Sequence, residues 1–428
     1  MRMNKTVGAL ALGFGFAAAA QAQDNTVGTA IYITGSTAFR QQVFNALKDL
    51  GLTVAQSGSG GNNSFTLYGS ISDTTAGQAL HLNTVAPGLA SQQVTAYCTF
   101  SGSAEGCQTL VNPGSATYQN TDAGTFTHTG ADLAFSDVAQ SSTPDSPVAT
   151  GVTLEEVQLP FDATNHGGIP GTGVAVQAFS YVINGTAASI KNVTSQNFQD
   201  LFHTGGLPLC FFTGNSSDFG TTVTPVGRYN LSGTRITAIL DSGAKLTQSL
   251  HQYALSDNGT TTPGLASTDT AAPPSDGTQW LSVGNNGYFS GGNVGKAIHA
   301  SSVNSAPPAI AYLGLADASS KLTATGGGAA ASEGPVAFNG QAPWVGGTYP
   351  SGNWNLSGVE NGSYTFWSYE RLYASPSDSS SSFIVGTFGP GLIAGLQYEI
   401  TNSTPLTAVL ESQMNVYRNA DGGDVLHY

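Results

Sequence analysis

The stretch of this chain best suited to chemistry is TPVGRYNLSGTR, at positions 224–235. An apolar run leads into Arg228, whose guanidinium offers a planar fork of hydrogen-bond donors. Ser232 and Thr234 add two hydroxyl donors, and Gly233 lets the backbone come close to a bound group. The apolar residues that follow could continue as a helix, whose free N–H groups would favour an anion. This order predicts an oxyanion site; the alternative is a strand-to-helix connection capped by Ser232, with Arg228 on the surface.

Charge and composition limit the kinds of molecule that such a site could bind. The chain has 428 residues, with 12 Lys plus Arg against 26 Asp plus Glu, and its formal net charge is −14. Nucleic acid and anionic membranes are therefore poor partners. A small anion stays compatible with this charge, because a buried site depends on its local donors. Apolar residues make up 40% of the chain and aromatic residues 9%, which argues against disorder.

The first 22 residues have the pattern of a secretory signal peptide. Arg2 and Lys5 form a basic start, residues 7–20 form an apolar core, and residues 20–22 form a small-residue cleavage site. The apolar core is too short and too rich in Ala and Gly for a membrane span. No cysteine near the cleavage site offers a lipid anchor. We therefore expect a soluble protein, periplasmic or secreted.

The three cysteines leave two alternatives open. In an oxidising compartment Cys98 and Cys107 could form a short-loop disulfide that leaves Cys210 free. Three buried, unpaired thiols are the other alternative. No spacing of Cys and His suggests a metal site, and we expect no cofactor.

Three times in the first third of the chain, an apolar strand ends in small polar residues. The strands and the residues after them are 30–33 with 34–37, 94–100 with 101–106, and 131–135 with 136–137. Helical patterns are expected after the first two, the second starting near Cys107. In α/β sheets, ligands gather at the carboxyl ends of strands, so this recurrence predicts a binding cleft.

Further along, strands and helices continue to alternate, which favours an α/β fold. Strands are predicted at 174–183, before Arg228, at 310–315 and at 364–367, with Thr194 as a helix N-cap and weaker closing elements at 392–398 and 408–417. Segments rich in Gly, Ser, Thr and Asn lie near 54–90, 112–130, 255–305 and 320–362. We expect these four segments to be long loop insertions.

In this order the pieces resemble the phosphate-binding proteins of bacterial ABC phosphate importers, which have the type II periplasmic binding-protein fold. The matching pieces are 33–37, 101–106, 134–137, 174–176 with 191–194, 226–228 with 232–234, and 311–314. The segment with the arginine and Ser-Gly-Thr is the most specific of them. The resemblance implies two lobes, with residues 24–173 plus 366–428 in lobe I and 174–365 in lobe II.

The resemblance also implies an anion clamped between the lobes. Its ligands would be Ser36, Thr37, Ser103, Asp137, Arg228, Ser232, Gly233 and Thr234. Asp137 would accept a hydrogen bond from the ligand. A carboxylate repels an oxyanion unless a proton lies between them; phosphate near pH 7 carries one and sulfate does not, so Asp137 would favour phosphate. Ordinary turn or helix-cap roles are the alternative for Asp137 and for the hydroxyl residues of lobe I.

Two features depart from the family. The first motif is compressed, which leaves open whether Thr37 or Ala38 meets the anion through its backbone. Where the phosphate binders commonly have an acidic residue two positions after the arginine, this chain has Asn230. An acidic residue there would orient the guanidinium, whereas Asn can bond it but lends no charge. Both departures leave anion binding intact and bear on which anion is preferred.

These inferences favour a monomeric exported binding protein that captures inorganic phosphate by hinge closure and passes it to an ABC permease of the inner membrane. The chain would not be an enzyme, since it has no Gly-x-Ser-x-Gly elbow and no His-Glu-x-x-His motif, and His166, the best candidate base, fits a loop better. Two alternatives stay open. The ligand could be another oxyanion or an organic phosphate, or the chain could be an extracellular adhesion or matrix protein that reuses the fold.

Overall fold

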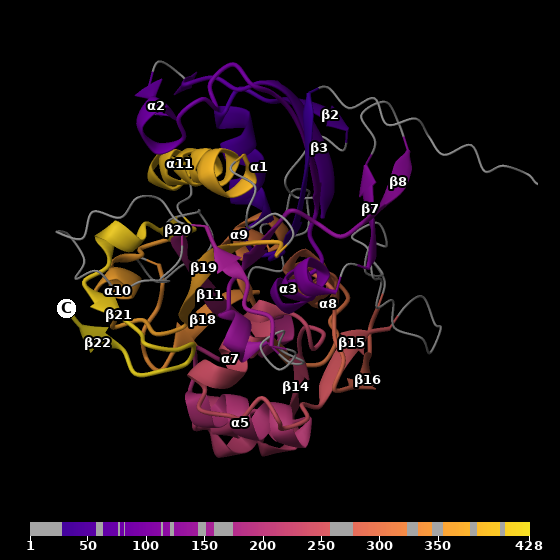
Figure 1. Ribbon diagram of the computed structural model, residues 1–428. Helices are drawn as coiled ribbons and strands as arrows, with labels where there is room; N and C mark the ends of the chain where they lie inside the picture. The colour runs from indigo at the N-terminus through magenta and orange to yellow at the C-terminus, as the bar shows by residue number, and fades with distance from the viewer. Residues whose placement is uncertain are drawn as a thin grey trace, which may run out of the picture.

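The computed structural model describes residues 28–56, 63–75, 78–80, 82–112, 114–119, 124–143, 151–157, 174–256, 277–322, 333–344, 354–376, 383–402 and 407–428. The expected signal peptide and His166 lie outside these residues. Strands and helices alternate around one large mixed sheet, which confirms the α/β class (Figure 1). No helix among the described residues is long and apolar enough to cross a membrane.

A continuous path of strands runs through the molecule. In order across the sheet it is β16 (Trp280–Gly284), β15 (Gln252–Leu255), β14 (Thr222–Val226), β17 (Ala309–Gly314), β11 (Ala175–Ile183), β19 (Trp367–Ala374), β9 (Leu133–Ser136), β1 (Thr29–Gly35), β6 (Gln93–Thr99), β3 (Ser64–Ser70) and β2 (Thr53–Gln56). Short strands branch from it or pair separately: β4 (Thr74–Thr75), β5 (Gln78–Ala79), β7 (Ser115–Gln119), β8 (Thr125–Thr129), β10 (Glu155–Glu156), β12 (Asn192–Val193), β13 (Leu207–Pro208), β18 (Gly334–Phe338), β20 (Ala408–Val409), β21 (Val416–Tyr417) and β22 (Leu426–His427). The α-helices are α1 (Arg40–Asp49), α2 (Leu82–Val85), α3 (Ser103–Val111), α5 (Ser195–Thr204), α6 (Cys210–Thr213), α7 (Gly233–Asp241), α8 (Gly291–Val303), α9 (Leu315–Lys321), α10 (Ser357–Glu360) and α11 (Gly389–Asn402).

The first half of the sheet consists of β9, β1, β6, β3 and β2. In it, β1 pairs in parallel with both β6 and β9. Helices α1 and α11 pack on one another beside these strands, although they come from opposite ends of the sequence (Figure 1). Apolar residues of both helices, such as Val43, Leu47 and Leu392, are buried in one core with the strands. The C-terminal helix therefore completes the core of the N-terminal strands.

The second half consists of β11, β17, β14, β15 and β16. Here β14 pairs in parallel with β17, and β11 pairs with β17 in the antiparallel sense. All nine residues of β11 are buried, which explains why its sequence is nearly continuously apolar. Thr194 caps α5 as expected: its Oγ1 accepts a hydrogen bond from the Asn197 amide at 3.1 Å. Tyr181 and Phe198 belong to a separate apolar core on this side.

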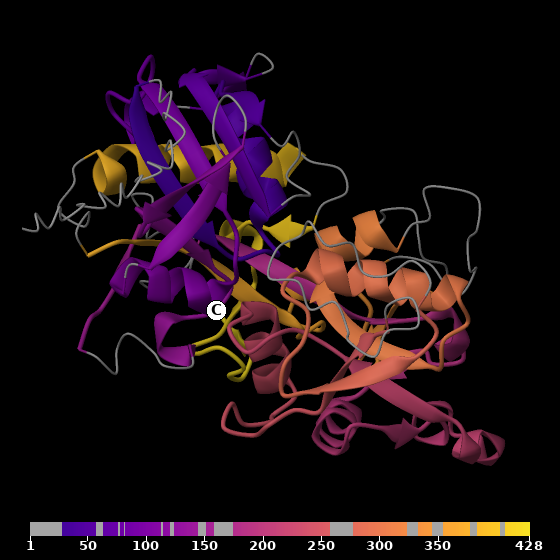
Figure 2. The ribbon, with the colours of Figure 1, turned by 90° about the vertical axis from the view of Figure 1, so that its right-hand side faces the viewer.

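Strands β11 and β19 join the two halves. β19 pairs with β11 through residues 367–370 and with β9 through residues 371–374, so it belongs to both halves. Figure 2 shows the first half of the sheet at the upper left and the second half at the lower right, with these strands between them. Because β11 and β19 connect the two halves, they are a suitable place for a hinge. The division into lobes at the expected boundaries stays a prediction.

Several expected elements differ from the structure. The helix after β6 begins at Ser103 rather than near Cys107, and the strand expected at 364–367 begins only at Trp367. Parts of the four expected loop insertions are regular: they contain β3, the β7–β8 hairpin, β18 and α8. The glycine-rich composition of residues 291–295 wrongly suggests a loop there. Gly291, Gly292 and Gly295 instead let helix α8 pack closely against α9. The cysteines Cys98, Cys107 and Cys210 are all free.

Candidate anion-binding site

The site begins at the carboxyl ends of three neighbouring parallel strands. Because β9, β1 and β6 are adjacent and parallel, the residues that follow them lie at one edge of the sheet. Thr37, Ser103 and Asp137 are each at most 2% exposed. The Ser103 hydroxyl donates to Asp137 Oδ1, and Ser36 lies in the same buried segment as Thr37. The recurrence of polar residues at strand ends thus does bring these side chains together.

The second half contributes the segment after β14. Arg228 is 1% exposed, so the alternative that places it on the surface is wrong. Ser232 is the N-cap of α7, and its Oγ accepts a hydrogen bond from the Arg235 amide at 3.4 Å. The capping alternative is therefore right for the side chain of Ser232. Gly233 and Thr234 form the first turn of this nine-residue helix, where backbone N–H groups lack helical acceptors.

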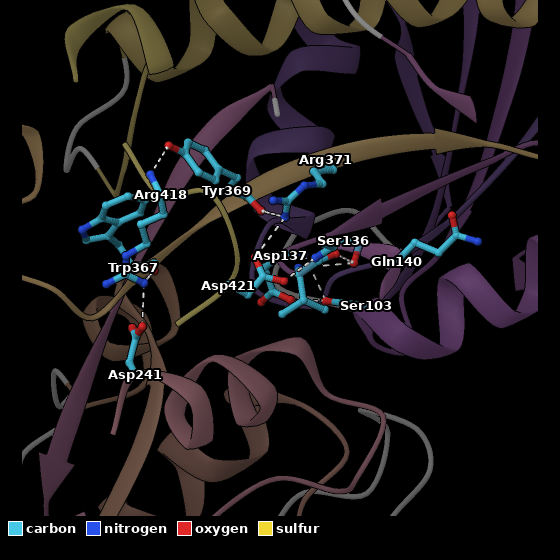
Figure 3. Close-up of polar contacts among 12 residues, drawn as sticks. Ser103, Ser136, Asp137, Gln140, Asp241, Trp367, Tyr369, Arg371, Arg418 and Asp421 are labelled. Atoms are coloured by element: carbon cyan, nitrogen blue, oxygen red, sulfur yellow. Dashed lines mark hydrogen bonds and ion pairs between the residues drawn. The ribbon is translucent and has the colours of Figure 1, made fainter. Parts of the chain in front are cut away.

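Residues of the two halves meet directly. Arg228 Nη2 donates to Thr37 Oγ1 at 2.9 Å, and Thr234 Oγ1 lies 3.4 Å from Asp137 Oδ2. A Cβ atom at position 233 would overlap the Asp137 carboxylate, so the close approach requires Gly233. Asp137 therefore lies between hydroxyl groups from both halves, at the start of α7 (Figure 3 shows Asp137 with Ser103).

The carbonyl groups of a neighbouring loop hold the Arg228 side chain in place. Its Nε donates to the Tyr288 carbonyl at 3.2 Å and its Nη2 to the Phe289 carbonyl at 2.8 Å. The Arg228 amide donates to the Tyr312 hydroxyl at 3.2 Å. Burial lowers the pKa of Arg228 from its ordinary value, and nearby groups, the Asp317 and Asp137 carboxylates among them, oppose that change. The guanidinium is thus pre-oriented.

Burial also shifts the titration of Asp137. Removal from water raises the pKa of this carboxyl to about 6, although the hydrogen bond from Ser103 and the positive charge of Arg228 act in the opposite direction. Asp137 is therefore mostly ionised at neutral pH and able to accept a hydrogen bond there. It gains a proton as the pH falls through about 6.

Sequence reasoning missed a second buried arginine and its partner. Arg40 Nη2 lies 2.7 Å from Asp317 Oδ1, and both side chains are 4% exposed. Arg40 also donates to the Thr37 carbonyl, so the ion pair joins α1 of the first half to α9 of the second half beside the site. Asn230, by contrast, is exposed. Asp317, and not residue 230, supplies the carboxylate near Arg228, and its position three residues after the end of β17 repeats the strand-end pattern.

Another carboxyl lies deeper in the first half. Glu370 on β19 is fully buried, and burial together with the Asp137 charge raises its pKa well above the ordinary value. The Ser36 hydroxyl lowers this pKa in part, which places Ser36 beside Glu370. Of the eight expected ligands, Ser232 thus caps its own helix and Ser36 lies toward Glu370, while Thr37, Ser103, Gly233 and Thr234 surround Asp137 and Arg228.

Comparison with known proteins adds a weak likeness. No family model and no curated protein matches the sequence. Among solved structures, the chain is similar to a protein from Clostridium perfringens named as a phosphate ABC transporter substrate-binding protein and solved with bound phosphate, at 12% identity over 89% of this chain and 99% of that chain, with a TM-score of 0.45. It is also similar to PstS from Borrelia burgdorferi, at 13% identity over 84% and 91% of the two chains, with a TM-score of 0.31. At this level of likeness, the ligand of this chain has to be argued from its own residues.

Proposed function

We propose that this chain is an exported binding protein that captures inorganic phosphate between two lobes, residues 24–173 plus 366–428 and residues 174–365. The observation that carries the proposal is the buried meeting of Arg228 and Asp137 with hydroxyl groups from both halves of the sheet. No described group of three or more His, Cys, Asp or Glu residues is placed to hold a metal ion, and the proposed role needs none.

The chemistry of the site suits a protonated tetrahedral anion. Arg228, the Thr37 hydroxyl and the amides at the start of α7 would donate to unprotonated oxygens. The Ser103 and Thr234 hydroxyls, which donate to Asp137 in this structure, would join them by turning toward the anion. Asp137 would accept a hydrogen bond from an oxygen that carries a proton. Phosphate near neutral pH offers both kinds of oxygen, whereas sulfate offers only the first, so the proposed site prefers phosphate.

Contacts between the halves would couple binding to closure. Arg228 donates to Thr37, Arg40 pairs with Asp317, and the Tyr229 hydroxyl lies 2.6 Å from Glu105 Oε2. Each of these contacts joins the first half to the second. We propose that bound phosphate favours the state in which they form, and that this closed monomer delivers phosphate to an ABC permease of the inner membrane. The signal-like segment at 1–22 supports export to the periplasm.

Isothermal titration of the mature protein, stripped of carried-over ligand, tests this function. We expect one-to-one phosphate binding that falls at least about 100-fold in Arg228→Gln, because a buried charged donor is lost. Lys245→Gln is the matched control, since Lys245 is exposed and the substitution removes the same charge. Near-UV circular dichroism checks that each variant is folded. Folded wild-type protein that gives no heat with phosphate refutes the proposal.

A further inference from the structure

The C-terminal residues 416–422 contact both halves of the molecule close to the anion-binding site. Arg418 is 6% exposed, and its guanidinium lies over the Trp367 ring at 4.3 Å from the ring centroid. It donates to the Thr365 carbonyl at 2.6 Å and pairs with Asp241 at 2.5 Å (Figure 3). Asp241 is the last residue of α7. Arg418 therefore fastens this segment, the C-terminal strap, to the second half.

Three residues later the strap reaches the first half. Asp421 Oδ2 accepts a hydrogen bond from the Ala139 amide at 2.6 Å, and Asp421 Oδ1 lies 3.4 Å from Arg371 Nη1. The Asp421 side chain is only 1% exposed. Figure 3 shows it beside Asp137, which precedes Ala139 by two residues. Asp421 thus fastens the strap to the segment that carries the site carboxylate.

The next residue returns to the second half. Gly422 has a φ of +67°, and a Cβ atom there would overlap the side chain of Leu240, near the C-terminal end of α7. Val138, Ala104 and Ile236 also form a small apolar cluster between the 137–139 segment, α3 and α7. Asp421 therefore lies between Arg418 and Gly422, which both contact the second half, while its own carboxylate binds the Ala139 amide of the first half.

We propose that Asp421 is a positioning residue, which couples the Asp137 segment to helix α7 through the C-terminal strap and slows release of the bound anion. The N-terminal turn of α7 carries Gly233 and Thr234, and the strap holds the other end of the same helix. To move Asp137 away from α7, the Asp421 bond to Ala139 has to break, or Arg418 and Gly422 have to leave their sites. The anion is phosphate if the proposed function is right, but the coupling of the two segments does not depend on its identity.

The test compares Asp421→Ala with Asp424→Ala. Asp424 lies three residues further along, just beyond the strap, and is exposed, so the control removes the same group from a nearby position. We expect Asp421→Ala to release phosphate about tenfold faster in a stopped-flow chase, and Asp424→Ala to behave as wild type. Asp421→Asn keeps a neutral acceptor for the Ala139 amide but loses the charge toward Arg371, so its release rate should lie between the two.

Hydrogen–deuterium exchange in phosphate-free protein reads the coupling directly. Peptides that cover 137–140 should exchange faster in Asp421→Ala than in wild type, while peptides from β1 and β6 should not change. An unchanged release rate together with unchanged exchange at 137–140 in folded Asp421→Ala overturns the proposal. If that variant does not fold, wild-type protein decides: an Ala139 amide that exchanges as fast as a free peptide amide also overturns it. If wild type binds no phosphate, the proposed function fails, and the exchange arm alone still tests the strap.

Discussion

The protonation of Asp137 should control which anion the site accepts. Sulfate carries no proton to share at neutral pH, so it can bind beside Asp137 only when the carboxyl itself is protonated. Burial raises the pKa of Asp137 to about 6, so the protonated form is lost as the pH rises through that value. Sulfate binding should therefore weaken between pH 5 and pH 8, while phosphate can supply the missing proton itself.

The size of the effect follows from the same pKa. At pH 8 about 1% of a carboxyl with a pKa of about 6 is protonated, and at pH 5 about 90% is. An anion that requires the protonated form should bind about 100-fold more weakly at pH 8 than at pH 5, which corresponds to about 3 kcal/mol. Asp137→Asn carries no titrating carboxyl, so its sulfate affinity should vary little over this range and should exceed that of wild type at pH 8.

Titration calorimetry with sulfate at pH 5, 6, 7 and 8 measures this directly, with phosphate titrated in parallel. Asp424→Asn is the control, because it removes one exposed carboxylate and leaves the site unchanged. Sulfate affinity of the wild type that is flat with pH would refute the reasoning. So would a pH dependence that persists undiminished in Asp137→Asn, since another group would then have to be its source.

Two further substitutions test the geometry of the site. Gly233→Ala should reduce phosphate affinity by at least about tenfold, because the added methyl group would overlap the Asp137 carboxylate and push it away from α7. Gly220→Ala is the matched control, since a Cβ atom there meets nothing within 4 Å. Equal phosphate affinities in the two variants would contradict this arrangement of the site. Asp317→Asn should lower the free energy of unfolding by about 3 kcal/mol in urea, because it leaves the buried Arg40 without its charged partner. Asp424→Asn, at an exposed position, should change that free energy by no more than about 0.5 kcal/mol, and a similarly small effect of Asp317→Asn would show that the Arg40 pair is not buried in solution.

The strand-end pattern could be predicted from the sequence because its physics is local. An apolar strand followed by small polar residues fixes where each side chain leaves the sheet, and the parallel pairing of β1 with β6 and β9 then brings the three ends together. The same reasoning located Arg228 after β14. The sequence could not predict in which direction each hydroxyl points. The Ser232 hydroxyl, for example, accepts a hydrogen bond from an amide of its own helix.

The ion pair between Arg40 and Asp317 shows where such reasoning stops. The two residues are 277 positions apart, and no pattern in either segment indicates the other. Sequence reasoning looked for the carboxylate that orients Arg228 next to it in the chain, at Asn230. The fold instead orients Arg228 with the Tyr288 and Phe289 carbonyls. It brings the Asp317 carboxylate near Arg228 from the start of α9, a position that depends on how β17 pairs with β14.

The balance of charge around the site explains how an acidic protein can hold an anion selectively. Arg40 and Arg228 are both buried near Asp317, so one of the two positive charges is offset before any ligand arrives. Asp137, when ionised, offsets the other. The unliganded site is therefore close to neutral, and a fully unprotonated anion would add uncompensated negative charge in a place with little water. Only an anion that shares a proton with Asp137 avoids that cost, and selectivity then comes from the acidic groups of the site as much as from its arginines.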